Sequence, residues 1–224
     1  MESIIFQNSF RPFFIAAGIW ATLAVPFWLL SYFGILIATE NFNILLWHQH
    51  EMLYGFVAAA ITGFILTAIP NWTGRLPIKN KPLAILAFLW IVGRVGFLNI
   101  AIFGTTVTTL MDLPFLIVLV LVIAREIVSG KNWRNLPVII LISFFTLGNI
   151  LVHLQIQEIL DSAELGIRLS TFTLSVLLAL IGGRIVPSFT RNWLSKNKAQ
   201  RFPSPAGIFD KISLVSLVVF VFAQ

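Results

Sequence analysis

The stretch that decides the fold class runs from Thr105 to Ala124 and reads TTVTTLMDLPFLIVLVLVIA, with Asp112 as its one charged residue. A helix needs roughly 20 predominantly apolar residues to cross the hydrocarbon core of a bilayer, and this stretch has that length. The stretch therefore predicts a transmembrane helix.

Five further stretches have the same character, and they cover residues 12–38, 44–69, 83–103, 136–157 and 165–186. Another apolar stretch begins at Ile212 but runs only to Gln224, which is too short to span. Pro70 and Pro187 are expected to end the second and sixth helices, because proline breaks helices. We therefore predict an all-α polytopic bundle of six complete spans and a truncated seventh. Residues 1–224 are expected to form a single domain, the N-terminal half of a longer protein.

The composition agrees with this fold class. Hydrophobic residues make up 58% of the chain and charged residues 11%, whereas soluble domains carry about 25% charged residues. The mean hydropathy is +0.94, so the expected surroundings are the lipid bilayer. The chain has no cysteine, which excludes disulfides, iron–sulfur clusters and covalently attached haem. Any metal must be held by histidine, methionine, carboxylate or backbone oxygen.

The net charge of +6 follows the pattern of membrane topology. Lys and Arg gather before the first span and in every second connection after it, whereas Glu40, Glu158, Asp161 and Glu164 fall in the alternate connections. Because positive residues mark the cytoplasmic side, the N-terminus is predicted to be cytoplasmic, and nucleic acid is not an expected partner. Trp47, Trp72 and Trp133 are expected at the membrane interfaces.

All the histidines of the chain, His48, His50 and His153, fall in one layer near the predicted outer ends of their spans. At about 1.5 Å of rise per residue, these residues and Asp112 lie about 5–10 Å from those ends. Ionisable residues at such depth cost about 2.5–3.5 kcal/mol each and therefore indicate function. Neutral imidazole suits zinc, copper and haem iron, so the layer predicts a metal or haem site.

Two histidines separated by one residue point about 200° apart on a regular helix. His48 and His50 therefore bind one ion only if the helix is irregular there, and otherwise they serve two neighbouring sites. Arg94 and Arg168 are candidates to pair with haem propionates, or simply with Glu51 and Asp112.

Plainer interpretations remain open for each of these residues. The histidines would then be hydrogen-bonded only, the arginines and carboxylates would form structural ion pairs, and Met52 and Met111 would serve packing rather than a copper(I) or haem site.

Four motifs resemble the NnrS family of bacterial nitric-oxide-response membrane proteins. They are SFRPFF at 9–14, WHQHEMLYGF at 47–56, PNWTGR at 70–75 and GGRIVPSFTRN at 182–192. The resemblance implies a protein of the bacterial inner (plasma) membrane that contains non-covalent haem and copper and is associated with denitrification and nitrosative-stress tolerance. The paired histidines of the family match His48 and His50, and His153 is similar to the fifth-helix pattern.

The leading hypothesis is a haem/copper protein that binds nitric oxide or a metal–nitrosyl species. His48, His50 and His153 are its candidate metal ligands, and His48, His50 and Arg94 are its candidate cofactor-binding residues. Glu51, Asp112 and Arg168 are expected around them. One alternative is a transporter that uses the buried His, Glu and Arg as a proton or metal relay. Another is a non-catalytic subunit or sensor. The sequence identifies no redox partner and leaves open whether the protein is an enzyme.

Overall fold

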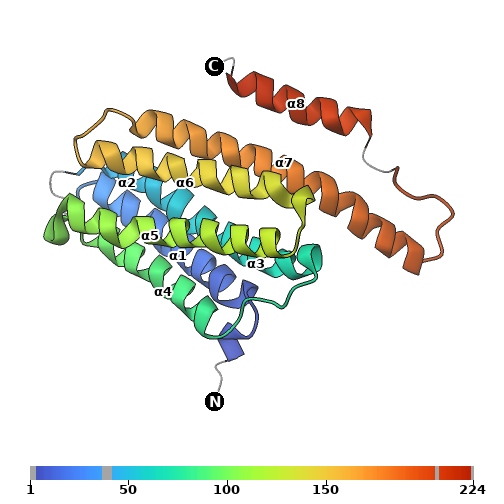
Figure 1. Ribbon diagram of the computed structural model, residues 1–224. Coiled ribbons are helices and arrows are strands. Elements are labelled where there is room, and N and C mark those ends of the chain that lie inside the picture. Colours follow the sequence, from blue (N-terminus) through green and yellow to red (C-terminus); the bar gives the residue numbers. More distant parts are fainter. Residues whose placement is uncertain (1–3, 37–41, 205–206, 223–224) are drawn as a thin grey trace. The chain divides into compact units, whose positions relative to one another are not determined.

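The computed structural model describes residues 4–36, 42–204 and 207–222. The elements of this part of the chain are helical, as Figure 1 shows. They are η1 (Ile4–Phe6), α1 (Phe10–Tyr32), α2 (Ile44–His50), the π-helical segment η2 (Glu51–Val57), α3 (Ala58–Thr73), α4 (Lys81–Leu98), α5 (Ile100–Ser129), η3 (Trp133–Asn135), α6 (Leu136–Ile156), α7 (Ala163–Lys196) and α8 (Ile208–Phe222).

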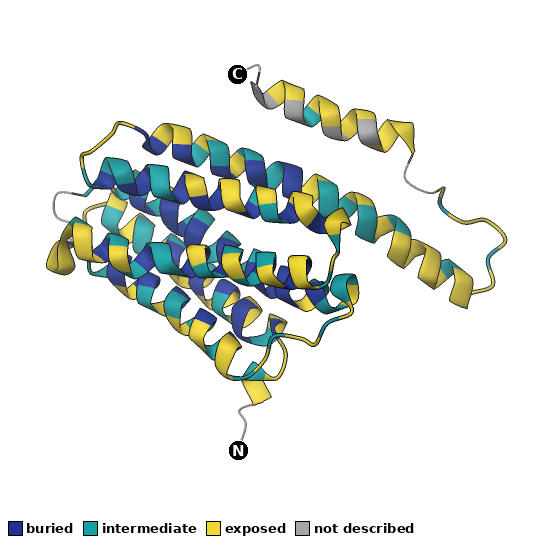
Figure 2. Ribbon diagram, viewed as in Figure 1, coloured by how far each residue is buried: buried dark blue, intermediate teal, exposed yellow. Residues whose placement is uncertain are grey.

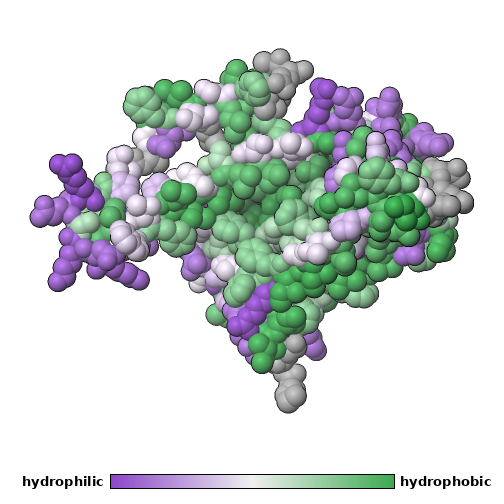
Figure 3. Space-filling view, turned by 180° about the vertical axis from the view of Figure 1, so that it is seen from behind, coloured by the Kyte–Doolittle hydropathy of each residue, from purple (hydrophilic) through white to green (hydrophobic). Residues whose placement is uncertain are grey.

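Six helices in the described residues are long and apolar enough to cross a membrane, which confirms the predicted fold class. They are α1, the continuous run α2–η2–α3, α4, α5, α6 and α7. On the face drawn in Figure 3, apolar side chains cover most of the helical surface. The short helix α8 begins at Ile208, four residues before the position expected from the sequence.

The chain divides into two compact units, residues 1–170 and residues 171–224. The first unit holds α1 to α6 and the beginning of α7, and it contains every residue of the candidate site. Within it α4 packs on α5, α1 packs on α3, and α5 packs on α6. Figure 2 shows the buried residues of these helices on their inward sides. Because this interior is built from several helices, polar groups from distant parts of the sequence can meet in it.

The expected helix ends at Pro70 and Pro187 were wrong, because both prolines lie inside their helices. Helix α3 continues to Thr73 and ends where Gly74 adopts a left-handed conformation, with φ of 69°. The backbone N–H of Gly74 donates to the carbonyl of Pro70, which closes the last turn. Glycine at this position is a stronger helix stop than proline within the span.

The boundary between the third and fourth spans contains two short breaks, at Asn99 and at Gly104. Helix α4 ends at Leu98, and α5 begins at Ile100 but is interrupted at Gly104, where φ is 73° and ψ is 169°. Only glycine adopts this backbone conformation readily. The predicted limits at Phe103 and Thr105 thus flank the break at Gly104.

Two of the tryptophans expected at the membrane interfaces differ in their exposure. The side chain of Trp133 is 59% exposed, but Trp47 is fully buried, and its Nε1 donates to the carbonyl of Phe97 at 3.1 Å. Glu40, which contributed to the predicted orientation, lies outside the described residues.

Candidate metal centre

The junction between α2 and η2 positions the first two residues of the site. Asn43 caps α2, since its Oδ1 accepts the backbone N–H groups of Leu45 (2.9 Å) and Leu46 (3.2 Å). The helix then widens into the π-helical segment at Glu51 and returns to α-helix at Ala58. Short π-helical segments inside α-helices often mark functional sites, because they change the direction of side chains relative to a regular helix.

His50 and Glu51, adjacent in sequence, are both fully buried at this junction. Nδ1 of His50 lies 3.0 Å from Oε1 of Glu51, and the imidazole stacks on the ring of Phe97 with a centroid distance of 3.7 Å. The orientation of His50 is therefore held from two sides.

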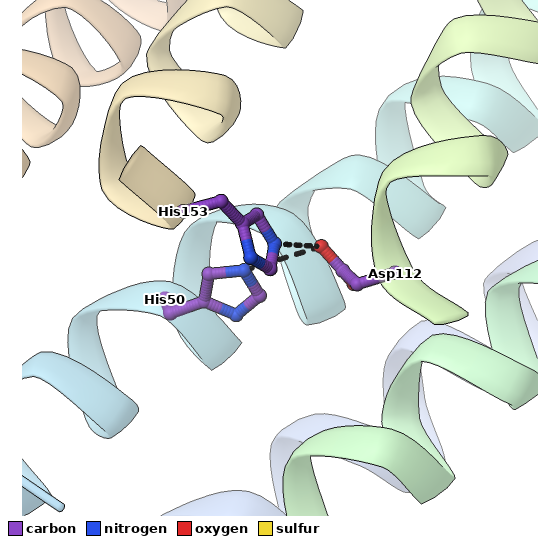
Figure 4. A group of neighbouring side chains, drawn as sticks. All are labelled: His50, Asp112 and His153. Carbon is purple, nitrogen blue, oxygen red and sulfur yellow. Dashed lines mark hydrogen bonds and ion pairs between the residues drawn. The ribbon is translucent and has the colours of Figure 1, made fainter. Parts of the chain in front are cut away.

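His50, Asp112 and His153 form a buried group contributed by α2, α5 and α6, as Figure 4 shows. Nε2 of His153 lies 3.0 Å from Oδ2 of Asp112, and Nε2 of His50 lies 3.3 Å from the same oxygen. Each residue offers one ligand atom, and these atoms all lie within 4.8 Å of one another. Two imidazole nitrogens and one carboxylate oxygen at this spacing suit a single transition-metal ion.

Arg94 joins the two carboxylates of the site. Its Nη1 donates to Oε2 of Glu51 at 2.7 Å, and its Nη2 donates to Oδ1 of Asp112. The guanidinium carbon lies 5.9 Å from the ring centroids of Trp20, Trp90 and Phe97. Because the side chain of Arg94 is only 4% exposed, the ion pairs are screened from solvent and the charges of the site are coupled.

Two glycines permit this close approach. A Cβ on Gly93 would lie 2.7 Å from Oδ1 of Asp112, and a Cβ on Gly55 would lie 2.6 Å from Nη1 of Arg94. Small residues let helices pack closely in membranes, and here they also leave room for the ion pairs between them.

Asn149 completes the hydrogen bonds around His50. Its Nδ2 donates to Oδ2 of Asp112 at 2.9 Å, and its Oδ1 lies 3.0 Å from Nε2 of His50. Both ring nitrogens of His50 therefore face oxygen acceptors, namely Glu51 and Asn149. Both acceptors are satisfied when both ring nitrogens carry a hydrogen.

His153 is held on its other side by Thr109. Nδ1 of His153 lies 2.9 Å from Oγ1 of Thr109, which in turn accepts a hydrogen bond from Gln157 at 2.9 Å. Thr106 donates to Oε1 of Gln157 at 3.1 Å and is exposed. A line of hydrogen bonds thus connects the buried group with the exposed Thr106 of α5.

The structure brings together five of the seven residues predicted from the sequence, and these are His50, Glu51, Arg94, Asp112 and His153. His48 lies elsewhere. The irregular segment begins after His50 rather than between the two histidines, so His48 faces α1, where it stacks on Trp28 with a centroid distance of 4.0 Å. The Nδ1 atom of His48 is buried and has no hydrogen-bond partner among the described residues.

Arg168 also lies apart from the group. Its Nη2 pairs with Oε1 of Glu164 at 2.6 Å, one helical turn away, and the two side chains are 65% and 79% exposed. Met111 packs against Gly96 where α5 crosses α4, which favours its plainer interpretation as a packing residue.

Sequence reasoning missed several residues of the site, above all Asn149, Thr109, Trp20 and Trp90. Asn149 precedes His153 by four residues, the spacing that puts two side chains on one helix face, and it is a polar residue within an apolar span. That signal was available in the sequence. The tryptophans gave no comparable signal, because aromatic residues are frequent in such a chain.

The residues fit a metal ion and a haem group to different degrees. The buried group fits a single ion, because its donor atoms converge and no larger ligand has room between side chains that are 0–3% exposed. A metal held at Nε2 of His50 would take the place of a hydrogen on that atom. His48 would be the residue that holds haem iron, because its imidazole is a nitrogen donor outside the enclosed group and is only partly buried.

The family model described as NnrS protein matches residues 4–224. Comparison with curated proteins and with solved structures gives no match.

Proposed function

The chain belongs to the NnrS protein family, and from this membership we propose that it is an integral membrane protein that binds copper and haem and acts in the response to nitric oxide. The proposed location is the inner membrane of a bacterium. Nitric oxide, or a metal–nitrosyl species formed from it, is the proposed ligand, and tolerance of nitrosative stress during denitrification is the proposed role.

One observation carries the metal-binding part of this proposal, namely the convergence of His50, Asp112 and His153 in the protein interior. The sequence contains no thiolate ligand, so imidazole and carboxylate are the strongest donors it offers. Such a donor set binds copper, iron or zinc, and family membership favours copper. Asp112, expected only around the site, becomes a proposed ligand because its Oδ2 faces both histidines.

The surrounding residues have distinct roles in this proposal. Glu51 orients His50 through Nδ1, and Thr109 orients His153 through Nδ1, so the Nε2 atoms of both rings face Oδ2 of Asp112 and would hold the ion there. Such partners set ring orientation and raise the basicity of the ligand. Arg94 supplies one positive charge between the two carboxylates and so offsets part of the cost of holding them in the interior of the bundle.

His48 is the proposed haem ligand. Its position on the α1 side of the helix, away from the metal group, agrees with two neighbouring sites rather than one shared site. A bound haem iron or copper ion would supply an electron-rich centre with affinity for nitric oxide, and the residues of the chain would hold and orient it.

The test is a comparison of variants of the full chain purified in detergent from cells supplied with haem and copper. We expect His50→Ala, His153→Ala and Asp112→Asn to lose bound copper, measured by elemental analysis, and to keep the haem absorption band. His48→Ala should lose the haem absorption band and keep bound copper, so each site provides the control for the other. A colourless and metal-free wild-type protein of normal helicity would refute the proposal.

A second candidate function is supported by a line of polar contacts that leads from the buried group to the surface. Hydrogen bonds and one ion pair connect Glu51, His50, Asp112, His153, Thr109, Gln157 and the exposed Thr106. Chains of ionisable groups within a membrane are typical of proton relays and transporters. This candidate predicts metal-coupled or proton-coupled uptake into proteoliposomes that is lost in Asp112→Asn. Copper binding without uptake would favour the first proposal.

A further inference from the structure

The second unit carries an exposed basic surface at the end of α7 and in the turn that follows it. We call its residues the basic cluster, and they are Arg191, Lys196, Lys198 and Arg201, all exposed. The sequence has no acidic residue from Leu165 to Phe209, and the ion pairs of the described residues include no member of the cluster. Figure 3 shows hydrophilic side chains gathered where α7 ends. The positive charge of this surface is therefore not compensated from within the described chain.

The turn after α7 gathers charges that lie apart in the sequence. Lys198 adopts a left-handed conformation, with φ of 54°, as the chain leaves the helix. Nη2 of Arg191 donates to the carbonyl of Pro203 at 2.9 Å, which fixes the returning chain beside the helix. Arg201 precedes Pro203 by two residues, so the fold holds two arginines in the same neighbourhood. Because like charges repel, this arrangement suits an anion between them.

Apolar side chains accompany the basic cluster. Val186, Phe189 and Trp193 are 64%, 66% and 64% exposed, and their spacings of three and four residues put them on one face of α7. Phe202, in the turn, is 49% exposed. Aromatic rings beside cations are typical of the membrane–water interface. A phospholipid matches both features, because its head group meets the cations while its acyl chains cover the rings.

The length of α7 places this surface at the level of the lipid head groups. The helix has 34 residues and is about 51 Å long, whereas the hydrocarbon core is about 30 Å thick. The predicted span ends at Val186, and Arg191 lies about 7.5 Å beyond it along the helix. Since head groups add about 5–7 Å on each side of the core, Arg191 reaches the depth of the phosphates on the predicted cytoplasmic side.

We propose that the end of α7 and the turn after it bind an anionic phospholipid, with the phosphate between Arg191 and Arg201 and the acyl chains along Phe189 and Trp193. Arginine suits this role, because its guanidinium pairs with phosphate through two parallel hydrogen bonds. The proposal concerns lipid binding alone and needs neither copper, haem nor nitric oxide, so it can fail or hold independently of the proposed function.

The test is the binding of dioctanoyl phosphatidylglycerol to the full chain in a neutral detergent, followed by native mass spectrometry. Dioctanoyl phosphatidylcholine carries no net charge, and glycerol phosphate carries the anionic group without acyl chains. We expect saturable binding of phosphatidylglycerol to the wild type and binding about tenfold weaker, or weaker still, for both comparison probes.

The double variant Arg191→Gln with Arg201→Gln should weaken the binding of the first phosphatidylglycerol about thirtyfold, because each basic residue near an anionic lipid contributes about 1 kcal/mol. Lys196→Gln with Lys198→Gln leaves the contact of Arg191 with Pro203 intact and should also weaken binding. Lys79→Gln with Lys81→Gln is the matched control, since it removes two exposed lysines of the same spacing on the same predicted side of the membrane. Its binding should equal that of the wild type.

Circular dichroism confirms that each variant is folded. The proposal would be overturned by absence of saturable binding to the folded wild type, by equal binding of phosphatidylcholine, or by unchanged binding in both cluster variants. Glycerol phosphate that binds as tightly as the lipid would also overturn it and would assign the cluster to a free phosphate. Tighter binding of a short oligonucleotide than of the lipid would overturn it in favour of nucleic acid.

Discussion

Arg94 determines the electrostatics of the site more than any other residue. It is the link between Glu51 and Asp112, which come from different helices, and its guanidinium lies among three aromatic rings. Removing one member of a buried ion pair leaves a charge without compensation, which is far more costly than losing an exposed pair.

We therefore expect Arg94→Leu to lower the free energy of unfolding by about 3–5 kcal/mol. Arg168→Leu is the control, because it removes an arginine of the same type from an exposed pair, where the cost is below about 1 kcal/mol. Unfolding in mixed micelles with increasing sodium dodecyl sulfate, followed by circular dichroism, measures both. If both variants lost the same small amount of unfolding free energy, the ion pairs of Arg94 would contribute little to stability.

At the scale of the element, the π-helical segment η2 is what makes the site possible. It turns Glu51, Tyr54 and Gly55 toward the interior directly after His50, and all of these residues are buried. Its Gly55 lies against the side chains of Trp20 and Arg94 and leaves no space for a methyl group.

Gly55→Ala should accordingly displace Trp20 or Arg94 and destabilise the protein by about 1–3 kcal/mol, the usual cost of overpacking. The same substitution at Gly18 of α1 has open space around it and should be neutral or stabilise by at most about 1 kcal/mol, because alanine favours helix. Thermal unfolding in detergent distinguishes the two variants. If Gly55→Ala were as stable as Gly18→Ala, the close packing of η2 on α1 and α4 would be refuted.

At the scale of the whole molecule, the distribution of charge predicts how the chain lies in the membrane. Arg125, near the end of α5, belongs to the predicted cytoplasmic side, and Asp161, in the connection between α6 and α7, belongs to the outer side. Both are exposed. The metal group lies toward the outer side in this orientation, where a diffusing gas or a periplasmic metal ion would reach it.

The absence of cysteine makes this orientation simple to test. Asp161→Cys should react with a membrane-impermeant maleimide in intact cells, whereas Arg125→Cys should react only after the membrane is opened. The cysteine-free wild type gives the background. The reverse pattern would place the N-terminus outside and would contradict the positive-inside prediction.

The spans were predictable because hydrophobicity and the rise of a helix are local properties of the chain. The layer of histidines stays a prediction, since it rests on counting residues along each expected span. The predicted helix ends were wrong where backbone conformation, rather than hydrophobicity, ends a helix. Gly74 is the example, because its left-handed conformation ends α3 beyond Pro70.

The sequence by itself determined that this protein is a helical membrane protein of six spans, and that Glu51, Arg94 and Asp112, placed within apolar stretches, need partners. Only the tertiary structure decided which partners they have. His48 and His50 are separated in sequence by a single residue, and nothing local tells which of them faces the interior. The π-helical segment and the packing against Trp28 and Phe97 set the rotation of the helix, and rotation depends on contacts between segments far apart in the chain.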